Sequence, residues 1–228
     1  MNHDTDADYT LLDALAVEAG TDKSSICHNY TKIYAKYFAA MKDKPIKFLE
    51  IGIFQGNSVK LWEDYFSEAE LHFIDIVAHP NQYQSGRSHY HYLDQGNPLE
   101  LRKFFEESGG EFDVIIDDGG HLMQQQILSF LMLFPALKSG GLYVIEDLHT
   151  SYWQNYGGGG SLEHPNPSPG STTEFLKRII DDLNYTGART SCADHDKTPL
   201  DIRLNLSYIQ ESLQSLHFYK SLCIAIRN

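Results

Sequence analysis

The sequence predicts an α/β protein with one doubly wound, mostly parallel sheet of seven strands that ends in a C-terminal antiparallel hairpin. The first observation is a succession of apolar runs that alternate with helical segments, which is the pattern of right-handed β-α-β crossovers. The second is that Val114, Ile115 and Ile116 are apolar on both faces, as a central parallel strand covered by helices must be. The third is a closing pair of apolar runs joined by a tight turn, which predicts a hairpin at the sheet edge.

Turn and cap residues divide the chain into its expected elements. Gly20 ends a first helix as a C-cap, and Pro45 breaks the chain before the first strand. Pro98 lies in the first turn of a later helix. After the first helix, further helices are expected over residues 26–41, 57–66, 98–107, 122–137 and 172–183. Strands are expected over residues 46–51, 71–75, 89–93, 112–118, 142–146, 208–217 and 222–227. Residues 79–88, 154–170 and 187–200 are expected to be irregular.

Composition favours one acidic domain. With 228 residues and 42% hydrophobic content the chain can bury one core, so we expect a single domain over residues 1–228, with N-terminal helices in residues 1–42. Eighteen basic against thirty-one acidic residues give a net charge of -13. Nucleic acids and anionic membranes bind through basic patches, so we expect neither as a partner and favour a small molecule.

The cysteines and the apolar runs predict a cytoplasmic location. Cys27, Cys192 and Cys223 are odd in number and far apart, which indicates reduced thiols and neither a disulfide framework nor a zinc site. The acidic first thirty residues do not read as a signal peptide. The longest apolar run, residues 127–137, is too short to span a bilayer.

A glycine turn after the first strand predicts a cofactor site. Gly52 and Gly56 stand between this strand and the next helix, where backbone can approach a ligand closely and free N–H groups are available. Asp75 ends the second strand some twenty residues later, the position from which a carboxylate binds ribose hydroxyls. Thr21, His28 and Tyr30, near the start of the second helix, are ambiguous residues that could reach a ligand carboxylate.

Two acidic pairs predict a cation site. Asp117 and Asp118 follow the central strand, and Glu146 and Asp147 follow the next one. Parallel strands end at the same edge of a sheet, where open α/β folds bind their ligands. Any single Asp here could equally cap the following helix, but both pairs together with His121 favour chemistry.

A long loop follows the second acidic pair. The stretch from Gln154 to Gly170 contains four consecutive glycines and three prolines, so it cannot form a regular element. Since it comes directly after the acidic residues, we expect residues 154–171 to act as a lid. Tyr152 and Trp153 are compatible with an aromatic acceptor pocket, although aromatic residues near a loop are as often packing residues.

These motifs together resemble a known family. The pattern comprises Glu50-x-Gly-x-x-x-Gly56, Asp75, Asp94-Gln95, Asp117-Asp-Gly-Gly-His121 and Gly140-Gly-Leu-Tyr-Val-Ile-Glu-Asp147, and it covers the chain from about Gly20 to the C-terminus. It is similar to class I S-adenosylmethionine-dependent methyltransferases with the Rossmann-like methyltransferase fold. Among these it most resembles the metal-dependent macrolide and rhamnosyl sugar O-methyltransferases of natural-product biosynthesis.

The resemblance implies a role for each matching residue. The cofactor S-adenosylmethionine would contact Thr21, Glu50, Gly52, Gly56, Ser58, Asp75, Asp94 and Gln95, with Asp117 in a supporting or cofactor-facing role. Mg²⁺ or Mn²⁺ would be held by Asp118, Glu146 and Asp147, because such ions prefer oxygen ligands. His121 would be the general base. Neighbouring residues on a strand point to opposite faces, so Glu146 and Asp147 can share one ion only if the chain bends there.

The resemblance also implies an acceptor. It would be a glycosylated small molecule whose sugar offers two neighbouring hydroxyls, since three carboxylates leave positions of an octahedral shell open. A homo-oligomer is compatible with it. The competing interpretations are an NAD(P)-dependent oxidoreductase, which would share the glycine turn and Asp75, a non-catalytic S-adenosylmethionine-binding module, and a metal-free methyltransferase.

Overall fold

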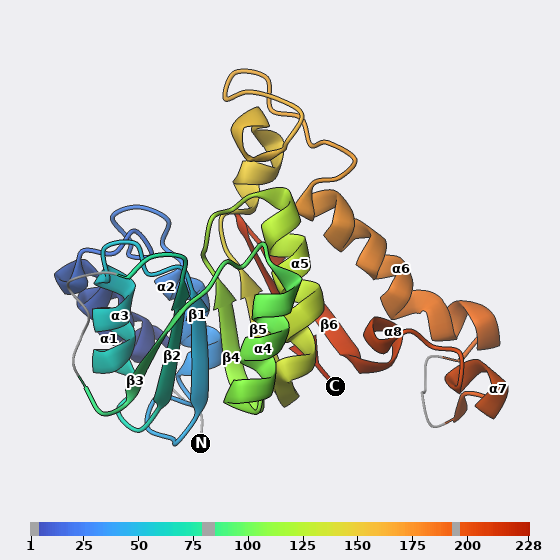
Figure 1. Cartoon of the computed structure of the whole chain (residues 1–228), viewed down its shortest axis with the longest axis horizontal. Coiled ribbons are helices and arrows are strands. Elements are labelled where there is room, and N and C mark those ends of the chain that lie inside the picture. The colour runs from blue at the N-terminus through green and yellow to red at the C-terminus, as the bar shows by residue number, and fades with distance from the viewer. Residues whose placement is uncertain (1–4, 79–84, 193–196) are drawn as a thin grey trace.

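The computed structural model describes residues 5–78, 85–192 and 197–228 and shows one seven-stranded sheet with helices on both faces (Figure 1). The strand order is β3-β2-β1-β4-β5-β7-β6. Strands β1 to β5 are parallel, whereas β7 is antiparallel to β5 and to β6, so the sheet is mixed and the predicted C-terminal hairpin is confirmed. The strands are β1 (Lys47–Ile51), β2 (Glu70–Asp75), β3 (Ser88–Tyr92), β4 (Phe112–Asp117), β5 (Leu137–Ile145), β6 (Leu213–Tyr219) and β7 (Leu222–Arg227).

Alternate residues of each strand enter two separate cores. On one face, Phe48 and Val114 pack with helices α1, α2 and α3; on the other, Leu49 and Ile115 pack with α4, α5 and α6. This period of two is what a strand buried on both faces requires. The helices are α1 (Thr5–Ala19), α2 (Thr31–Phe38), α3 (Asn57–Tyr65), α4 (Pro98–Ser108), α5 (Met123–Leu133), α6 (Thr172–Thr190), α7 (Leu200–Arg203) and α8 (Tyr208–Ser212), with 3₁₀ turns η1 (Phe134–Ala136), η2 (Leu148–Tyr152) and η3 (Gln154–Tyr156).

The segment before α2 differs from the prediction. The expected helix over residues 26–41 begins only at Thr31, because the chain from residue 21 to residue 30 forms a series of tight turns. Asn29 has a left-handed φ of 55°, which an α-helix cannot contain. This segment folds across the carboxyl edge of the sheet, and so it contributes to the site.

Three further boundaries also differ. Helix α6 continues through Gly187 to Thr190, where an irregular stretch was expected. Strand β5 begins at Leu137, because its pairing with β4 shifts register and so continues past the two glycines. Residues Tyr208–Ser212 form a helix rather than the start of a strand, since Ser207 and Gln210 make a capping box. Of the expected loop at 79–88, residues 79–84 lie outside the described residues.

The glycine-rich loop stands above the carboxyl edge of the sheet, at the top of Figure 1. Apart from η3 and a bridge between Trp153 and Gly160 it has no regular structure, as predicted. Its backbone is held by turns, among them Gly159 N–H donating to Asn166 O and Ser161 N–H donating to His164 O. That this loop acts as a lid stays a prediction. Within the described part of the chain, no helix has the length and apolar character needed to span a membrane.

A buried histidine on β2 gives the fold a pH dependence. His72 donates or accepts at Nδ1 with His91 and at Nε2 with Glu70, and burial lowers the pKa of His72 to about 4. The unfolded chain binds this proton near pH 6.5, so between these pH values it binds more protons than the folded protein. Stability contributed by neutral His72 is therefore complete above pH 6.5 and is lost as the pH falls towards 4.

We expect His72→Gln to flatten this pH dependence. Between pH 7 and pH 4 the wild-type protein should lose up to about 3 kcal/mol more free energy of unfolding than the variant, at 1.36 kcal/mol per pKa unit. Urea denaturation at several pH values measures the difference. His164→Gln, at an exposed position in the glycine-rich loop, is the control. Parallel pH profiles for wild type and His72→Gln would contradict the assignment.

Candidate active site

Two adjoining cavities lie at the carboxyl ends of β1, β2 and β4. The first, of 290 Å³, is lined by Asp75, Ile76, Asp94 and the Gly119-Gly120 turn. The second, of 430 Å³, is lined by residues 20–22, residues 52–55, Asn57, Ser58, Asp118, Gly119, His121 and Asp147. Both cavities are lined by Gly52, Phe54, Asp118 and Gly119, so they adjoin along these residues.

The glycine turn allows the first and central strands to approach closely. Gly52 has a φ of +99°, and a Cβ atom on it would lie 2.1 Å from the carbonyl oxygen of Asp118. No other residue fits there. The turn also carries Phe54, which is 78% exposed, has a left-handed φ of 47° and borders both cavities. Phe54 is missed by sequence reasoning, although a bulky residue between two turn glycines is the signal for it.

Asp75 lies in the first cavity, but part of its carboxylate already binds backbone. Asp75 Oδ2 accepts hydrogen bonds from the N–H groups of Ile53 and Phe54, and Oδ1 accepts one from Val77. Asp75 thus holds the glycine turn in place. Asp94 lies in the same cavity, where one of its oxygens accepts from Gly96 N–H.

Asp117 and Gln95 bind each other beside this cavity. Gln95 Nε2 donates to Asp117 Oδ1 and to Ser129, while its Oε1 accepts from Gly120 N–H at 2.7 Å. Burial raises the pKa of Asp117 to about 6. Through Gln95 the Asp117 carboxylate is linked to the Gly119-Gly120 turn, and its supporting or cofactor-facing role stays a prediction.

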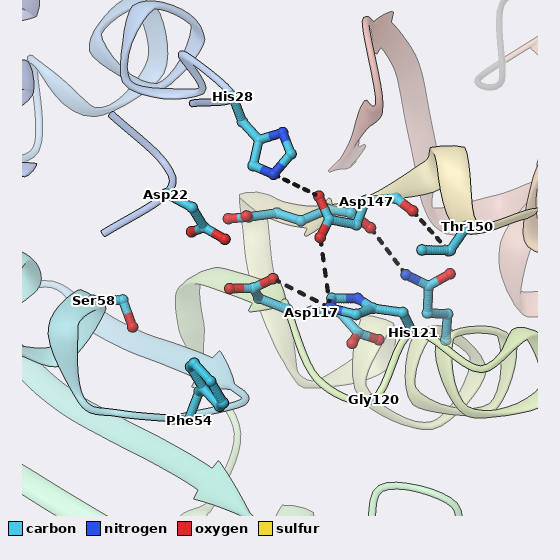
Figure 2. Close-up of polar contacts among 12 residues, drawn as sticks. Asp22, His28, Phe54, Ser58, Asp117, Gly120, His121, Asp147 and Thr150 are labelled. Atoms are coloured by element: carbon cyan, nitrogen blue, oxygen red, sulfur yellow. Dashed lines mark hydrogen bonds and ion pairs between the residues drawn. The ribbon is translucent and has the colours of Figure 1, made fainter. Parts of the chain in front are cut away.

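Asp118, His121 and Asp147 meet in the second cavity, and Figure 2 shows His121 and Asp147 pointing toward each other. Their ligand atoms all lie within 4.8 Å of one another. His121 Nε2 is 3.9 Å from Asp118 Oδ1 and 3.6 Å from Asp147 Oδ2. His121 and Asp147 both have a φ of 55°, a strained conformation that often marks a functional site.

A group of aromatic side chains surrounds Asp147. Tyr30 donates a 2.7 Å hydrogen bond to Asp147 Oδ1, and His28 Nε2 lies 4.0 Å from the same oxygen (Figure 2). His28 stacks at 5.8 Å on His149, whose ring is 4.7 Å from Trp153. The sequence marks His28 and Tyr30 only as ambiguous, and it is the series of turns before α2 that brings them here.

Glu146 lies apart from this group. Strand β5 ends at Ile145, and the left-handed bend at Asp147 sends the two acidic side chains in different directions. Glu146 is 1% exposed, accepts a 2.9 Å hydrogen bond from Lys23 Nζ and a second from Tyr34, and is absent from the candidate metal group. The distances therefore group Asp118 with His121 and Asp147, and Glu146 as a further ligand of the same ion stays a prediction.

Lys23 is the residue that sequence reasoning misses most clearly. It is fully buried and pairs with Asp118, with Glu146 and, at 3.6 Å, with Glu50. Burial lowers the pKa of Lys23, but the three carboxylates raise it by more, so the ammonium group stays charged. Burial also raises the pKa of Glu50 to about 7, against the opposing effect of Lys23. Glu50 accepts from Ser58 and borders neither cavity.

The donor atoms of the second cavity fit a hard divalent cation. Asp118 Oδ1 and Asp147 Oδ2 are carboxylate oxygens on two different strand ends, and both residues are only partly exposed. Carboxylate oxygens with room for further oxygen ligands suit Mg²⁺ or Mn²⁺. Among the described residues His121 Nδ1 is buried without a hydrogen-bond partner, whereas Nε2 lies toward the carboxylates of Asp118 and Asp147.

Comparison with known proteins finds similar methyltransferases. No family model matches the chain. It is 32% identical over 219 residues to 8-demethyl-8-α-L-rhamnosyl tetracenomycin-C 2'-O-methyltransferase of Streptomyces olivaceus, covering 90% of this chain and 56% of that protein. It is 34% identical over 226 residues to L-olivosyl-oleandolide 3-O-methyltransferase of Streptomyces antibioticus, covering 96% of this chain and 55% of that protein.

A solved structure agrees with these relatives. MycE methyltransferase from the mycinamycin biosynthetic pathway, in complex with Mg and SAH, superposes with a TM-score of 0.80 at 26% identity, over 95% of this chain and 54% of that one. The fold is therefore that of the Rossmann-like methyltransferases. Within that fold the chain is related, along most of its length, to sugar O-methyltransferases of macrolide and tetracenomycin biosynthesis. It spans about half the length of these relatives.

Proposed function

We propose that this chain is the S-adenosylmethionine-binding and catalytic part of a Mg²⁺-dependent O-methyltransferase that acts on a sugar hydroxyl of a glycosylated small molecule. The observation that carries the proposal is that the two cavities adjoin along Gly52, Phe54, Asp118 and Gly119. The nucleoside end of a cofactor in the first cavity would contact Asp75 and Asp94, and its reactive end would reach the second cavity beside Asp118, His121 and Asp147.

The side chains of the second cavity can bind a metal ion and take up a proton. When bound, S-adenosylmethionine supplies the methyl group and the divalent ion lowers the pKa of the acceptor hydroxyl. Asp118 and Asp147 hold the ion and orient the acceptor next to the methyl group. His121 Nε2 faces these carboxylates and accepts the hydroxyl proton as general base. Thr21 and Ser58 line the cavity from the other side.

The relatives guide the choice of acceptor. The similar proteins are named as methyltransferases of rhamnosyl and olivosyl groups, and MycE has been solved with Mg, SAH and mycinamycin VI. A neutral glycoside also agrees with a net charge of -13, which would repel a phosphorylated sugar. A cytoplasmic location belongs to the same proposal, and a homo-oligomer is compatible with it.

We expect S-adenosylhomocysteine to bind the purified chain and NAD not to bind. Asp75→Asn should weaken S-adenosylhomocysteine binding by about 10–100-fold, because it removes a charged acceptor that also fixes the glycine turn. Isothermal titration calorimetry measures both. Asp64→Asn, on the exposed side of α3, is the control. Preferential binding of NAD would instead support the oxidoreductase interpretation.

We also expect the acceptor to bind through two neighbouring hydroxyls. One hydroxyl would anchor the ring while the other reacts, which turns an encounter into a positioned reaction. A rhamnoside that lacks the non-methylated neighbouring hydroxyl should therefore show a kcat/KM at least about tenfold lower than the matched diol. Methyl transfer from labelled cofactor measures this. Equal turnover of the two acceptors would rule out two-point binding.

A further inference from the structure

The buried ammonium group of Lys23 has no part in the proposed chemistry. Among the described residues Lys23 is the one lysine classed as buried, with 0% exposure. A buried charge is costly unless it is paired and hydrogen-bonded, so a position of this kind is retained only where partners surround it. The partners come from three strand ends: Glu50 in β1, Asp118 after β4 and Glu146 after β5.

The two oxygens of Asp118 face different groups. Oδ2 accepts a short hydrogen bond from Lys23 Nζ, while Oδ1 is the oxygen nearest His121 Nε2 in the candidate metal group. Asp118 thus bridges the ammonium group and the cavity. A carboxylate fixed through one oxygen has little rotational freedom, so its other oxygen is presented in one place.

The backbone next to Lys23 lines the second cavity. Gly20, Thr21 and Asp22 all border the second cavity, and Thr31 N–H donates to the carbonyl of Lys23 at 3.1 Å. The segment is therefore fixed at one end by helix α2 and at its side chain by the carboxylates. Lys23 therefore connects the wall of the second cavity to Asp118.

We propose that Lys23 is a positioning residue of the metal centre: its ammonium group holds Asp118 so that Oδ1 is offered to a divalent ion. This inference rests on the proposed function, because it assumes that Asp118 and Asp147 bind the ion. Groups that orient a metal ligand from behind typically affect metal affinity by roughly 10–100-fold. Loss of the Lys23 ammonium group frees Asp118 to rotate and leaves it beside Glu146 without a neutralising charge.

The test compares Lys23→Met with Lys60→Met. Methionine keeps the length of the side chain and removes the charge, and Lys60 is a surface lysine paired with Glu18 and Asp64. We expect calorimetric titration with MgCl₂ alone to show a 10–100-fold weaker affinity for Lys23→Met and wild-type affinity for Lys60→Met. S-adenosylhomocysteine binding, measured on the same samples, reports whether the cofactor cavity is intact.

A measurement on the unsubstituted protein covers the case in which Lys23→Met does not fold. The Nζ resonance of Lys23 is followed by ¹⁵N NMR during addition of MgCl₂, and we expect it to shift in step with metal binding. A folded Lys23→Met protein with wild-type or higher Mg²⁺ affinity, or an Nζ resonance that does not respond, would overturn the inference. Metal-dependent methyl transfer by the wild type would then leave the proposed function standing, whereas a wild-type chain that binds no Mg²⁺ would overturn both.

Discussion

Replacing His121 by alanine is expected to lower kcat by about 10²–10⁴-fold, the usual contribution of a positioned general base. Nε2 of His121 lies within 4 Å of both carboxylates that would bracket the reacting hydroxyl, so it is placed to take the proton. Its other nitrogen is buried, so Nε2 is the atom that can do so. Single-turnover methyl transfer measures the effect, because it separates chemistry from product release.

The substitution should lower the rate of methyl transfer and leave cofactor binding unchanged. S-adenosylhomocysteine affinity should change little, because His121 lies at the reactive end of the cavity and away from Asp75 and Asp94. His89→Ala, at an exposed position on β3, serves as a control for loss of a histidine away from the site. If kcat fell only a few-fold in a folded His121→Ala protein that still bound Mg²⁺, His121 would have a structural role instead.

Asp147→Asn is expected to lower kcat/KM by about 10³-fold at fixed Mg²⁺, which corresponds to the several kcal/mol that a bound metal ion supplies. Asp147 Oδ2 is one of the two carboxylate oxygens in the candidate metal group, and an amide oxygen carries no charge to replace it. The loss should be partly restored by raising the Mg²⁺ concentration. Initial rates over a range of Mg²⁺ concentrations measure both effects.

Glu146→Gln is the matched comparison for Asp147→Asn. Glu146 is the adjacent acid, but its carboxylate accepts hydrogen bonds from Lys23 and Tyr34. The Mg²⁺ affinity of the Glu146→Gln protein should therefore stay within a few-fold of wild type. The sequence-based ligand set predicts the opposite, an equal loss from both variants. Equal losses of Mg²⁺ affinity in Glu146→Gln and Asp147→Asn would therefore show that Glu146 is also a ligand.

The alternation of strands and helices and the edge that carries the site could be predicted from the sequence. Strands such as β4 are continuous β-branched runs, and the residues that follow them are acidic, so their common edge follows from parallel pairing. The glycine turn could also be predicted, because Gly52 has to be glycine for the turn to pass Asp118. These features depend on local pattern alone.

The direction of individual side chains could not be predicted in this way. Glu146 and Asp147 separate because Asp147 adopts a left-handed conformation, which no residue pattern marks at an aspartate. Lys23 lies in a polar stretch that reads as a solvated turn, and only contacts 95 and 123 residues away in the chain explain its burial. Interactions over such separations are a property of the assembled sheet.

The same separations determine when the site can form during folding. The hydrogen bond from Tyr30 to Asp147 spans 117 residues, and the turn between the last two strands also supports the site, because Ser221 O accepts from Leu148 N–H at 2.9 Å. Contacts between residues so far apart in the chain cost loop-closure entropy and form slowly. On the ribosome, the support that Ser221 gives to the segment after Asp147 therefore forms only after the β6-β7 turn has been synthesised, so the surroundings of the metal residues are completed late.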